Sequence, residues 1–251
     1  MKVTIITATL NNSSTITETI NSVLSQDFFD IEHIIIDGSS SDGTLEIIND
    51  YKSKNKSVKL FSEKDNGVYN ALNKGLSLAT GDIIGFLHSD DVFGSKTIIS
   101  EIISIFENND ADGVYGNLQY VKNSDISKVI RNWKSRKFYP EMIKNAWMPA
   151  HPTLFLKKGV YEKHGNFNPT YKISADYEFI IRVFKDQFLN FHYTPKVITK
   201  MRLGGISNRS LKNIFIKSLE DYRAMKKHKV GNIFTLARKT LSKIDQYFSK
   251  G

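Results

Sequence analysis

The chain has 251 residues, of which 40% are hydrophobic, so it is long enough to bury one large core. It contains no cysteine, which excludes a disulfide framework and thiolate metal sites, and no stretch reaches the roughly 20 apolar residues that a membrane-spanning helix needs. The net charge of +9 is uneven: residues 1–205 carry 24 Lys and Arg against 23 Asp and Glu, whereas residues 206–251 carry 11 against 3. We therefore expect one main domain followed by a basic tail.

The first half of the chain alternates between strand and helix patterns. It opens with a buried strand at 2–7, whose apolar run is too short for a secretory signal. Thr15 and Glu18 predict a capping box at the start of a helix that ends near Gln26. Further strands are predicted at 31–37, 58–62 and 82–88, and further helices at 44–54, 68–80 and 95–108. This alternation indicates an α/β fold with a parallel, doubly wound sheet between helices.

Polar side chains follow four of these strands, at the point where each strand ends. They are Thr9 and Asn11 after the first strand, Asp37 at the end of the second, Asp65 after the third, and Ser89, Asp90 and Asp91 after the fourth. Ligands of doubly wound sheets bind at the carboxyl ends of the strands. The sequence therefore predicts one binding site at this edge.

The adjacent carboxylates of Asp90 and Asp91 are the sharpest feature of that edge. Two neighbouring carboxylates repel each other, and a divalent cation such as Mg²⁺ or Mn²⁺ removes the repulsion while also binding diphosphate oxygens. The alternative is a solvated turn in which an Asp caps the helix near Ser95.

After residue 112 the pattern changes to shorter strands at 113–122, an aromatic and basic stretch at 131–147 and a P-A-H-P loop at 149–152. Asp176 then begins a helix with an apolar face. A carboxylate there can act as a general base towards a hydroxyl, although the helix dipole alone also favours Asp in a first turn.

Five segments, in order, resemble family 2 glycosyltransferases with the GT-A fold, and most closely the bacterial enzymes that assemble O-antigen and capsule repeat units. The segments are T-I-I-T-A-T-L-N-N, I-I-I-D-G-S-S-S-D-G-T, D-N-G-V-Y-N-A-L-N-K-G, A-T-G-D-I-I-G-F-L-H-S-D-D and S-A-D-Y-E-F-I-I-R-V. The resemblance covers about residues 1–207. It implies a catalytic domain with a nucleotide-sugar half at 1–112 and an acceptor half at 113–207.

The resemblance implies a set of donor-binding residues. Asp37 matches the acid that accepts the N3 hydrogen of uracil or thymine, although Asp37 or Asp42 could equally cap the turn that follows. Thr7, Ala8 and Thr9 would line the base pocket largely through their backbone. The other residues implied are Asp65 and Gly67 against the nucleoside, and Ser89 and Ser207, while Asn73 and Gly75 are expected to secure helix packing.

The resemblance also implies the catalytic residues. Asp90 keeps the last position of the family's D-x-D signature and is the candidate metal ligand, whereas His88 replaces the first Asp, which usually binds the ribose. Asp176 matches the catalytic base. His88, Asp91 and His151 are candidates for acceptor contacts or supporting roles, and packing roles remain equally open for the two histidines. The segment 201–207, at the place of a loop that closes over the diphosphate, lacks the histidine metal ligand of many relatives.

We therefore expect an inverting, metal-dependent glycosyltransferase. It would move a sugar from a nucleotide diphosphate, expected to be a UDP-sugar, to a hydroxyl of a lipid-linked glycan in bacterial surface polysaccharide synthesis. Two alternatives stay open: a sugar-1-phosphate nucleotidyltransferase, which lacks support because its Gly-rich, Arg-containing loop is missing, and a non-catalytic binding protein for nucleotides or nucleic acid. Against nucleic acid, the basic excess lies in the tail while the strand-edge cluster is acidic.

The basic tail at 208–251 shows an apolar stripe with helical spacing. Its members are Phe234, Ala237, Leu241, Ile244 and Phe248, and Arg238, Lys239 and Lys243 flank it. Either the stripe packs on the catalytic domain, or the tail lies on an anionic membrane surface. The second reading places a cytoplasmic protein at the inner face of the plasma membrane.

Overall fold

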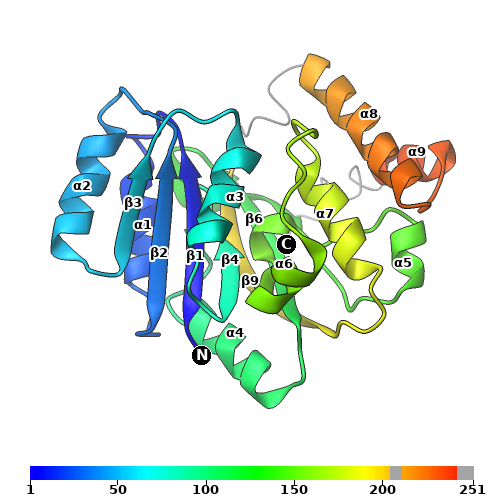
Figure 1. Cartoon of the computed structure of the whole chain (residues 1–251), viewed down its shortest axis with the longest axis horizontal. Helices are drawn as coiled ribbons and strands as arrows, with labels where there is room; N and C mark the ends of the chain where they lie inside the picture. The colour runs from blue at the N-terminus through cyan, green and yellow to red at the C-terminus, as the bar shows by residue number, and fades with distance from the viewer. Residues whose placement is uncertain (204–210, 242–251) are drawn as a thin grey trace.

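The computed structural model describes residues 1–203 and 211–241. At its centre is a mixed sheet with the strand order β3-β2-β1-β4-β8-β6-β9-β5, in which β7 pairs with β6. Helices cover both faces of this sheet (Figure 1). The mostly parallel sheet between helices is the GT-A-like arrangement that the sequence predicts.

The first half of the chain builds the parallel part of the sheet. Its elements are β1 (Val3–Thr9), α1 (Ile16–Leu24), β2 (Ile31–Asp37), α2 (Thr44–Lys54), β3 (Val58–Ser62), α3 (Val68–Leu78) and β4 (Ile83–Phe86). The predicted segments 31–37, 44–54 and 58–62 agree with β2, α2 and β3 to the residue, and the others shift by up to three residues. All pairings among these four strands are parallel.

The second half adds a mixed part, of which the alternating pattern predicts only the helix at 95–108. Its elements are β5 (Val92–Phe93), α4 (Ile98–Asn108), β6 (Gly113–Lys122), β7 (Asp125–Trp133), α5 (Glu141–Lys144), η1 (His151–Thr153), β8 (Phe155–Lys157), α6 (Lys158–His164), α7 (Ala175–Phe184) and β9 (Phe191–Arg202). The short strand β8 pairs antiparallel with both β4 and β6, while β6 and β9 are parallel. The sheet as a whole is therefore mixed rather than purely parallel.

Buried apolar side chains form separate layers on the two faces of the sheet. Alternate residues of a strand point to opposite faces, so Ile6 packs with α3 and α7 residues, whereas Ile5 packs with α4 residues and Ile35 with α1 and α2. Gly75 shows how closely α3 approaches the sheet: a Cβ at this position would lie within 2.4 Å of an Ile6 methyl carbon. Gly75 is therefore a packing residue, as expected.

Two further helices, α8 (Leu211–Lys227) and α9 (Ile233–Leu241), follow the sheet. Helix α8 packs against α7, and α9 packs against α8. In Figure 1, α8 lies at the same end of the molecule as the carboxyl ends of β1, β2 and β3. No helix in the described part of the chain is both long and apolar enough to span a membrane.

The structure corrects two local predictions. Thr15 does precede α1, but its hydroxyl donates to the Ser89 carbonyl at 2.9 Å and Glu18 pairs with Arg202, so the predicted capping box is wrong. Lys239, predicted to flank the apolar stripe of the tail as a solvated or membrane-facing lysine, is only 7% exposed. Phe234 of the stripe is 80% exposed, while Lys243, Ile244 and Phe248 lie outside the described residues.

Candidate active site

The loops that follow β1 and β2 are joined by hydrogen bonds and form one wall of the site. Asn11 donates its backbone N–H to Ser40 Oγ at 2.8 Å and accepts the Ser41 N–H on its side-chain oxygen at 2.9 Å. Asp42 accepts N–H groups from Ser13 and Thr44 at 3.0 and 3.1 Å. The two loops therefore hold each other in place, and Asp42 serves the turn-capping role considered for it.

Asp37 lies between Thr9 and Ser62 in the strand register, at the carboxyl end of the sheet. Its carboxylate is fully buried and accepts hydrogen bonds from the backbone N–H groups of Ser39 and Ser40 and from the hydroxyls of Ser40 and Ser62, at 2.5 to 3.1 Å. Both oxygens are thus occupied by the chain itself. This geometry fits the turn-capping alternative for Asp37.

Two polar atoms near Asp37 have no hydrogen-bond partner in the described part of the chain. They are Thr9 Oγ1 and Asp65 Oδ2, and both are shielded from solvent. Burial raises the pKa of Asp65; the negative charges of Glu63 and Asp37 add to this effect, and Lys74 opposes it. An unpaired carboxylate oxygen at the carboxyl edge of the sheet can accept a hydrogen bond from an N–H donor.

The remaining donor-side residues have mainly structural positions. Thr7 is fully buried and its hydroxyl donates to the Leu87 carbonyl at 2.7 Å, so its side chain belongs to the sheet. Ala8 is 9% and Ser89 is 6% exposed. Gly67 precedes α3 with a φ of 114°, a left-handed conformation that favours glycine. Ser207 lies outside the described residues.

Asp90 and Asp91 have different surroundings although they are neighbours. Asp90 is half-buried, and within residues 1–203 and 211–241 its carboxylate has no hydrogen-bond partner. Asp91 is fully buried and accepts the backbone N–H of Arg202 at 3.1 Å. Burial, with the Asp90 charge, raises the pKa of Asp91 well above its ordinary value, while Arg202 opposes the shift. Asp91 Oδ2 has no partner among the described residues but is shielded from solvent, so Asp90 is the more accessible carboxylate for a ligand. Neither residue caps α4, which begins after Thr97.

Arg202 fixes the loop that carries these two acids. It is 3% exposed, and its guanidinium donates to the backbone carbonyls of Asp90 and Asn123 at 2.5 and 3.1 Å and to the Glu18 carboxylate at 2.8 Å. One side chain thus ties β9 to α1, to the turn between β6 and β7, and to the Asp90 loop.

Asp176 lies in the first turn of α7. The single O–H of Tyr69 in α3 is shared between the Ile173 carbonyl at 2.7 Å and Asp176 Oδ1 at 3.1 Å. Burial raises the pKa of Tyr69 well above its usual value, and the Asp176 carboxylate adds to this. The phenol therefore stays protonated and orients one oxygen of Asp176, leaving the other for a substrate.

His88 lies near both Asp90 and Asp176, and His151 lies near Asp176. The ring centroids of the two histidines are 6.1 Å apart, and the His151 ring also packs against Phe86 and Phe167. Burial lowers the pKa of both rings, to about 4 for His151, although Asp176 opposes the shift in both and Asp90 also opposes it in His88. His151 is 7% exposed, and neither of its ring nitrogens has a partner among the described residues. It is a neutral ring with unused hydrogen-bonding capacity.

The possible metal-ligating side chains suit a metal ion that is bound together with a substrate rather than by the protein alone. Over the described ranges, no group of three or more His, Asp or Glu side chains is arranged to hold a metal. Asp90 offers a free carboxylate, and Mg²⁺ commonly binds through one or two carboxylates with phosphate oxygens and water as its other ligands. The residues therefore fit a nucleotide-borne divalent cation.

Sequence reasoning missed three residues around this site: Tyr69, Arg202 and Glu220. Glu220 of α8 accepts backbone N–H groups from the loop directly before α7. Its signal in the sequence is the acidic pair Glu220 and Asp221 inside the strongly basic tail. Asn73 has the packing role that was expected, since its amide exchanges two hydrogen bonds with the Phe167 backbone.

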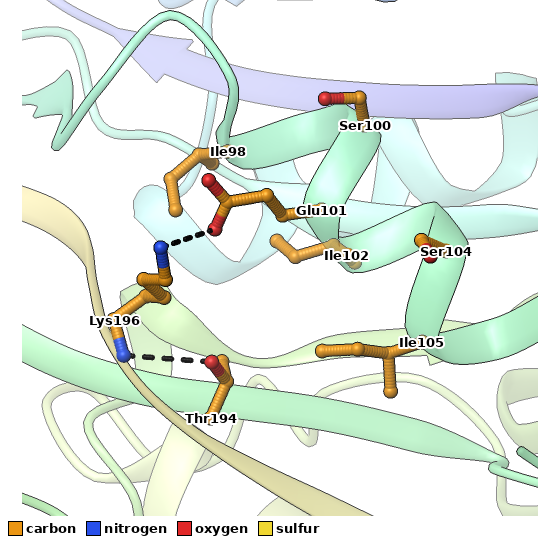
Figure 2. A pocket seen from close by; sticks show the side chains of 8 residues that line it. All are labelled: Ile98, Ser100, Glu101, Ile102, Ser104, Ile105, Thr194 and Lys196. Carbon is orange, nitrogen blue, oxygen red and sulfur yellow. Dashed lines mark hydrogen bonds and ion pairs between the residues drawn. The ribbon is translucent and has the colours of Figure 1, made fainter. Parts of the chain in front are cut away.

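A separate surface hollow lies between α4 and the first half of β9 (Figure 2). Its wall contains the ion pair between Glu101 and Lys196 at 3.4 Å. None of the predicted site residues lines it, and α4 lies at the opposite end of the molecule from the carboxyl ends of β1–β3 (Figure 1).

Curated relatives that match more than four fifths of this chain are glycosyltransferases. The PGL/p-HBAD biosynthesis glycosyltransferase of Mycobacterium tuberculosis (strain ATCC 25177 / H37Ra) is 29% identical over 218 residues, covering 86% of this chain and 82% of the relative. An uncharacterized glycosyltransferase of Haemophilus influenzae is 28% identical over 223 residues, covering 84% and 68%.

Solved structures share the fold. TarS 1-349 of S. aureus in complex with UDP-GlcNAc has a TM-score of 0.71 at 19% identity, and the match covers 91% of this chain and 65% of that one. The mannosyltransferase PcManGT of Pyrobaculum calidifontis, in complex with GDP-Man and Mn²⁺, has a TM-score of 0.65 at 16% identity, covering 100% and 76%. The family model described as Glycosyl transferase family 2 matches residues 4–165, and the chain therefore belongs to this family of glycosyltransferases.

Proposed function

We propose that this enzyme transfers a sugar from a uridine diphosphate donor to a glycan hydroxyl with inversion at the anomeric carbon. The observation that carries the proposal is the placement of Asp90 and Asp176. Both are half-buried, and the charge of each opposes the fall in the pKa of His88 that burial causes. Asp90 lies in the loop after β4 and Asp176 in the first turn of α7. One acid is free for the donor side, and the other is oriented by Tyr69.

Asp176 is the general base in this proposal. The acceptor hydroxyl oxygen attacks the anomeric carbon, its proton passes to Asp176, and the bond from the anomeric carbon to the diphosphate oxygen breaks. A carboxylate suffices because the hydroxyl becomes acidic as the new bond forms. His151 supports the acceptor, since a neutral buried ring with two unpaired nitrogens can bind a sugar hydroxyl.

Asp90 would hold a divalent cation, Mg²⁺ or Mn²⁺, together with the diphosphate. When bound, such an ion stabilises the negative charge that develops on the leaving diphosphate. The mannosyltransferase from Pyrobaculum calidifontis, which has the same fold, was solved with Mn²⁺. Support from this chain is the unpaired Asp90 carboxylate described above.

The base pocket would select uracil through Asp65 and Thr9, two residues of the donor set. Both carboxylate oxygens of Asp37, the other candidate, already accept hydrogen bonds from the chain. Asp65 Oδ2 and Thr9 Oγ1 are unpaired within the described chain, and a carboxylate oxygen can accept the N3 hydrogen of uracil. TarS, a structural neighbour, was solved with UDP-GlcNAc.

The acceptor is proposed to be a lipid-linked glycan of a bacterial surface polysaccharide such as an O-antigen or capsule, met at the inner face of the plasma membrane. Support comes from the outer face of α8, where Phe215 and Leu219 are 65% and 54% exposed. Lys212, Arg223 and Lys226 are exposed on the same face at helical spacing. An apolar stripe with flanking cations is the pattern of a helix lying on anionic lipid.

The test uses purified full-length protein with UDP-GlcNAc, UDP-glucose, UDP-galactose and GDP-mannose in the presence of Mn²⁺. We expect release of UDP, and the Asp176→Asn variant should be slower by about 10² to 10⁴ while UDP binding stays within a few-fold. Asp50→Asn, on the exposed side of α2, is the control for loss of a carboxylate.

Near wild-type turnover by Asp176→Asn would remove this residue from the mechanism. Release of pyrophosphate from UTP and a sugar 1-phosphate would identify a nucleotidyltransferase instead. Nucleic acid binding without any sugar transfer would favour a non-catalytic role.

A further inference from the structure

Helices α8 and α9 contact the residues just before and just after Asp176. The family model ends at residue 165, so α7, α8 and α9 all lie beyond it. The contacts come from the inward face of α8, where Glu220 and Asp221 are 9% and 4% exposed. These are two of the three acids in a segment with 11 basic residues.

Glu220 binds the loop that leads into α7. Its Oε1 accepts the N–H of Lys172 at 2.7 Å, and its Oε2 accepts the N–H groups of Ile173 and Ser174 at 2.8 and 2.9 Å. Ser174 precedes the first residue of α7 but makes no side-chain cap, and Asp176 follows two residues later. Three consecutive amides are thus held by one carboxylate from a helix some 45 residues further along the chain.

A second contact reaches the residue after Asp176. Lys239 of α9 donates to Asp221 Oδ2 at 2.8 Å, and its ammonium lies 3.0 Å from the ring centroid of Tyr177. Burial lowers the pKa of Lys239 to about 8, and the charges of Asp221 and Asp176 oppose the shift. Glu220 therefore holds the backbone before Asp176. The pair of Asp221 and Lys239 contacts the ring of Tyr177, the residue that follows Asp176.

We propose that Glu220 is a positioning residue for the general base. Through three backbone hydrogen bonds it fixes the loop 172–174 and the first turn of α7, and so sets where the Asp176 carboxylate meets the acceptor hydroxyl. This inference rests on the proposed role of Asp176. A charge-assisted carboxylate clamp on several amides is strong, and a displacement of about 1 Å at a reacting group can slow a reaction about a hundredfold.

The chain offers a matched control in Glu178. This residue of α7 is also a fully buried carboxylate in contact with the extension, since it accepts hydrogen bonds from Lys227 at 2.9 Å and His228 at 2.7 Å. These bonds join α7 to the far end of α8, a further bond from Arg182 at 3.0 Å stays within α7, and none of them touches the loop before Asp176. Glu178→Gln therefore weakens the attachment of the extension without releasing that loop.

The experiment measures UDP release from the uridine diphosphate sugar that is turned over fastest, with Mn²⁺ and water or simple alkyl glycosides as acceptors. Glu220→Gln, Glu178→Gln, Asp176→Asn and the double variant Glu220→Gln/Asp176→Asn are compared as full-length proteins. We expect Glu220→Gln to lower kcat about ten- to a hundredfold with the KM for the donor and the Kd for UDP within about twofold. Hydrogen exchange of amides 172–174 should accelerate in this variant and not in Glu178→Gln.

The double variant decides whether Glu220 acts through Asp176. If it does, the double variant is no slower than Asp176→Asn alone, because the positioned group is already gone. Unchanged kcat in Glu220→Gln, or losses that multiply in the double variant, would overturn the positioning role. Should Glu220→Gln fail to fold, Glu220→Asp, which is shorter by one methylene, serves the same comparison with a smaller expected loss.

Failure of the proposed function gives a different result. An Asp176→Asn variant with full turnover contradicts the base assignment, and a wild-type protein that cleaves none of the uridine diphosphate sugars contradicts the donor class. Both are measured independently of Glu220.

Discussion

At the scale of single residues, Asp90 and Asp91 should respond differently to substitution. Asp90→Ala removes the free carboxylate and should abolish metal-dependent activity. Asp91→Asn should keep activity within a few-fold, because burial already favours the neutral form of Asp91 and an amide oxygen can still accept the Arg202 N–H. Activity is measured over a range of Mn²⁺ concentrations and in excess chelator.

Full activity of the wild-type protein in chelator would contradict the metal assignment. An inactive but folded Asp91→Asn variant would show that Asp91 is also needed at the ligand, against its buried position.

Asp65 should govern the choice of nucleobase. Wild-type protein is expected to bind UDP more tightly than CDP, because the cytosine N3 presents a lone pair where uracil presents a hydrogen. Asp65→Ala should weaken UDP binding about tenfold and should narrow the difference in affinity between UDP and CDP. Calorimetric titration with both nucleotides and Mn²⁺ measures this.

Asp37→Ala is the comparison for Asp65. Because its carboxylate holds the loop after β2, this variant should lower Tm more than Asp65→Ala does. Loss of base selectivity in Asp37→Ala with unchanged selectivity in Asp65→Ala would reverse the assignment.

These residue environments mark the limit of what the sequence could predict. The motifs located Asp90 and Asp176, but one of the hydrogen bonds that engage Asp37 comes from Ser62, and the backbone N–H bound to Asp91 comes from Arg202, 111 residues away. Hydrogen bonds between segments so distant in sequence follow from the tertiary fold and leave no local pattern.

At the scale of elements, the contact of α7 with α8 should give the protein part of its acid sensitivity. Burial tends to raise the pKa of Glu178, but hydrogen bonds from His228 and Lys227 outweigh it and hold the pKa at about 2. A carboxylate with a lowered folded-state pKa stabilises the fold above its unfolded value of about 4.5 and loses this contribution as pH falls towards about 2.

Glu178→Gln should therefore lower Tm at pH 7, and the difference from wild type should shrink as pH falls from 5 to 3. Thermal melts across this range measure the effect. A difference in Tm that stays constant with pH would show that ionisation of Glu178 contributes nothing.

The elements themselves were predicted unevenly. Strands and helices of the parallel half follow from apolar runs and turn residues, so β2, α2 and β3 were predicted to the residue. The strand order of the second half was not predicted, because the three-residue strand β8 inserts antiparallel between β4 and β6, and β5 has only two residues. Such short strands exist through their partners and carry no periodicity of their own.

At the scale of the whole molecule, the proposed membrane contact is tested on the outer face of α8. The double variant Phe215→Ser/Leu219→Ser should bind phosphatidylglycerol vesicles about tenfold more weakly than wild type, with little binding to phosphatidylcholine in either case. Its turnover of a soluble donor and acceptor should be unchanged. Each basic residue near an anionic surface contributes about 1 kcal/mol, so binding should also fall as salt rises.

The matched control is Val129→Ser/Ile130→Ser on β7, which removes two apolar side chains that are 42% and 43% exposed elsewhere on the surface. Equal loss of vesicle binding in both double variants would contradict a specific role of α8. Deleting α9 is a poorer test, since it would also remove Lys239 from the buried Asp221 of α8.

Helix α8 carries the two neighbours Leu219 and Glu220 on different faces, about 100° apart around its axis. Leu219 is 54% exposed, and Glu220 holds the loop before Asp176. With its outer face on lipid, this helix would act as a spacer of fixed thickness, because a helix with its side chains is about 10–12 Å across. The reacting hydroxyl would then have to stand at about that height above the headgroups. The enzyme would select acceptors by the distance of the reacting hydroxyl from the membrane. It would favour a sugar close to the lipid anchor over one at the end of a long chain.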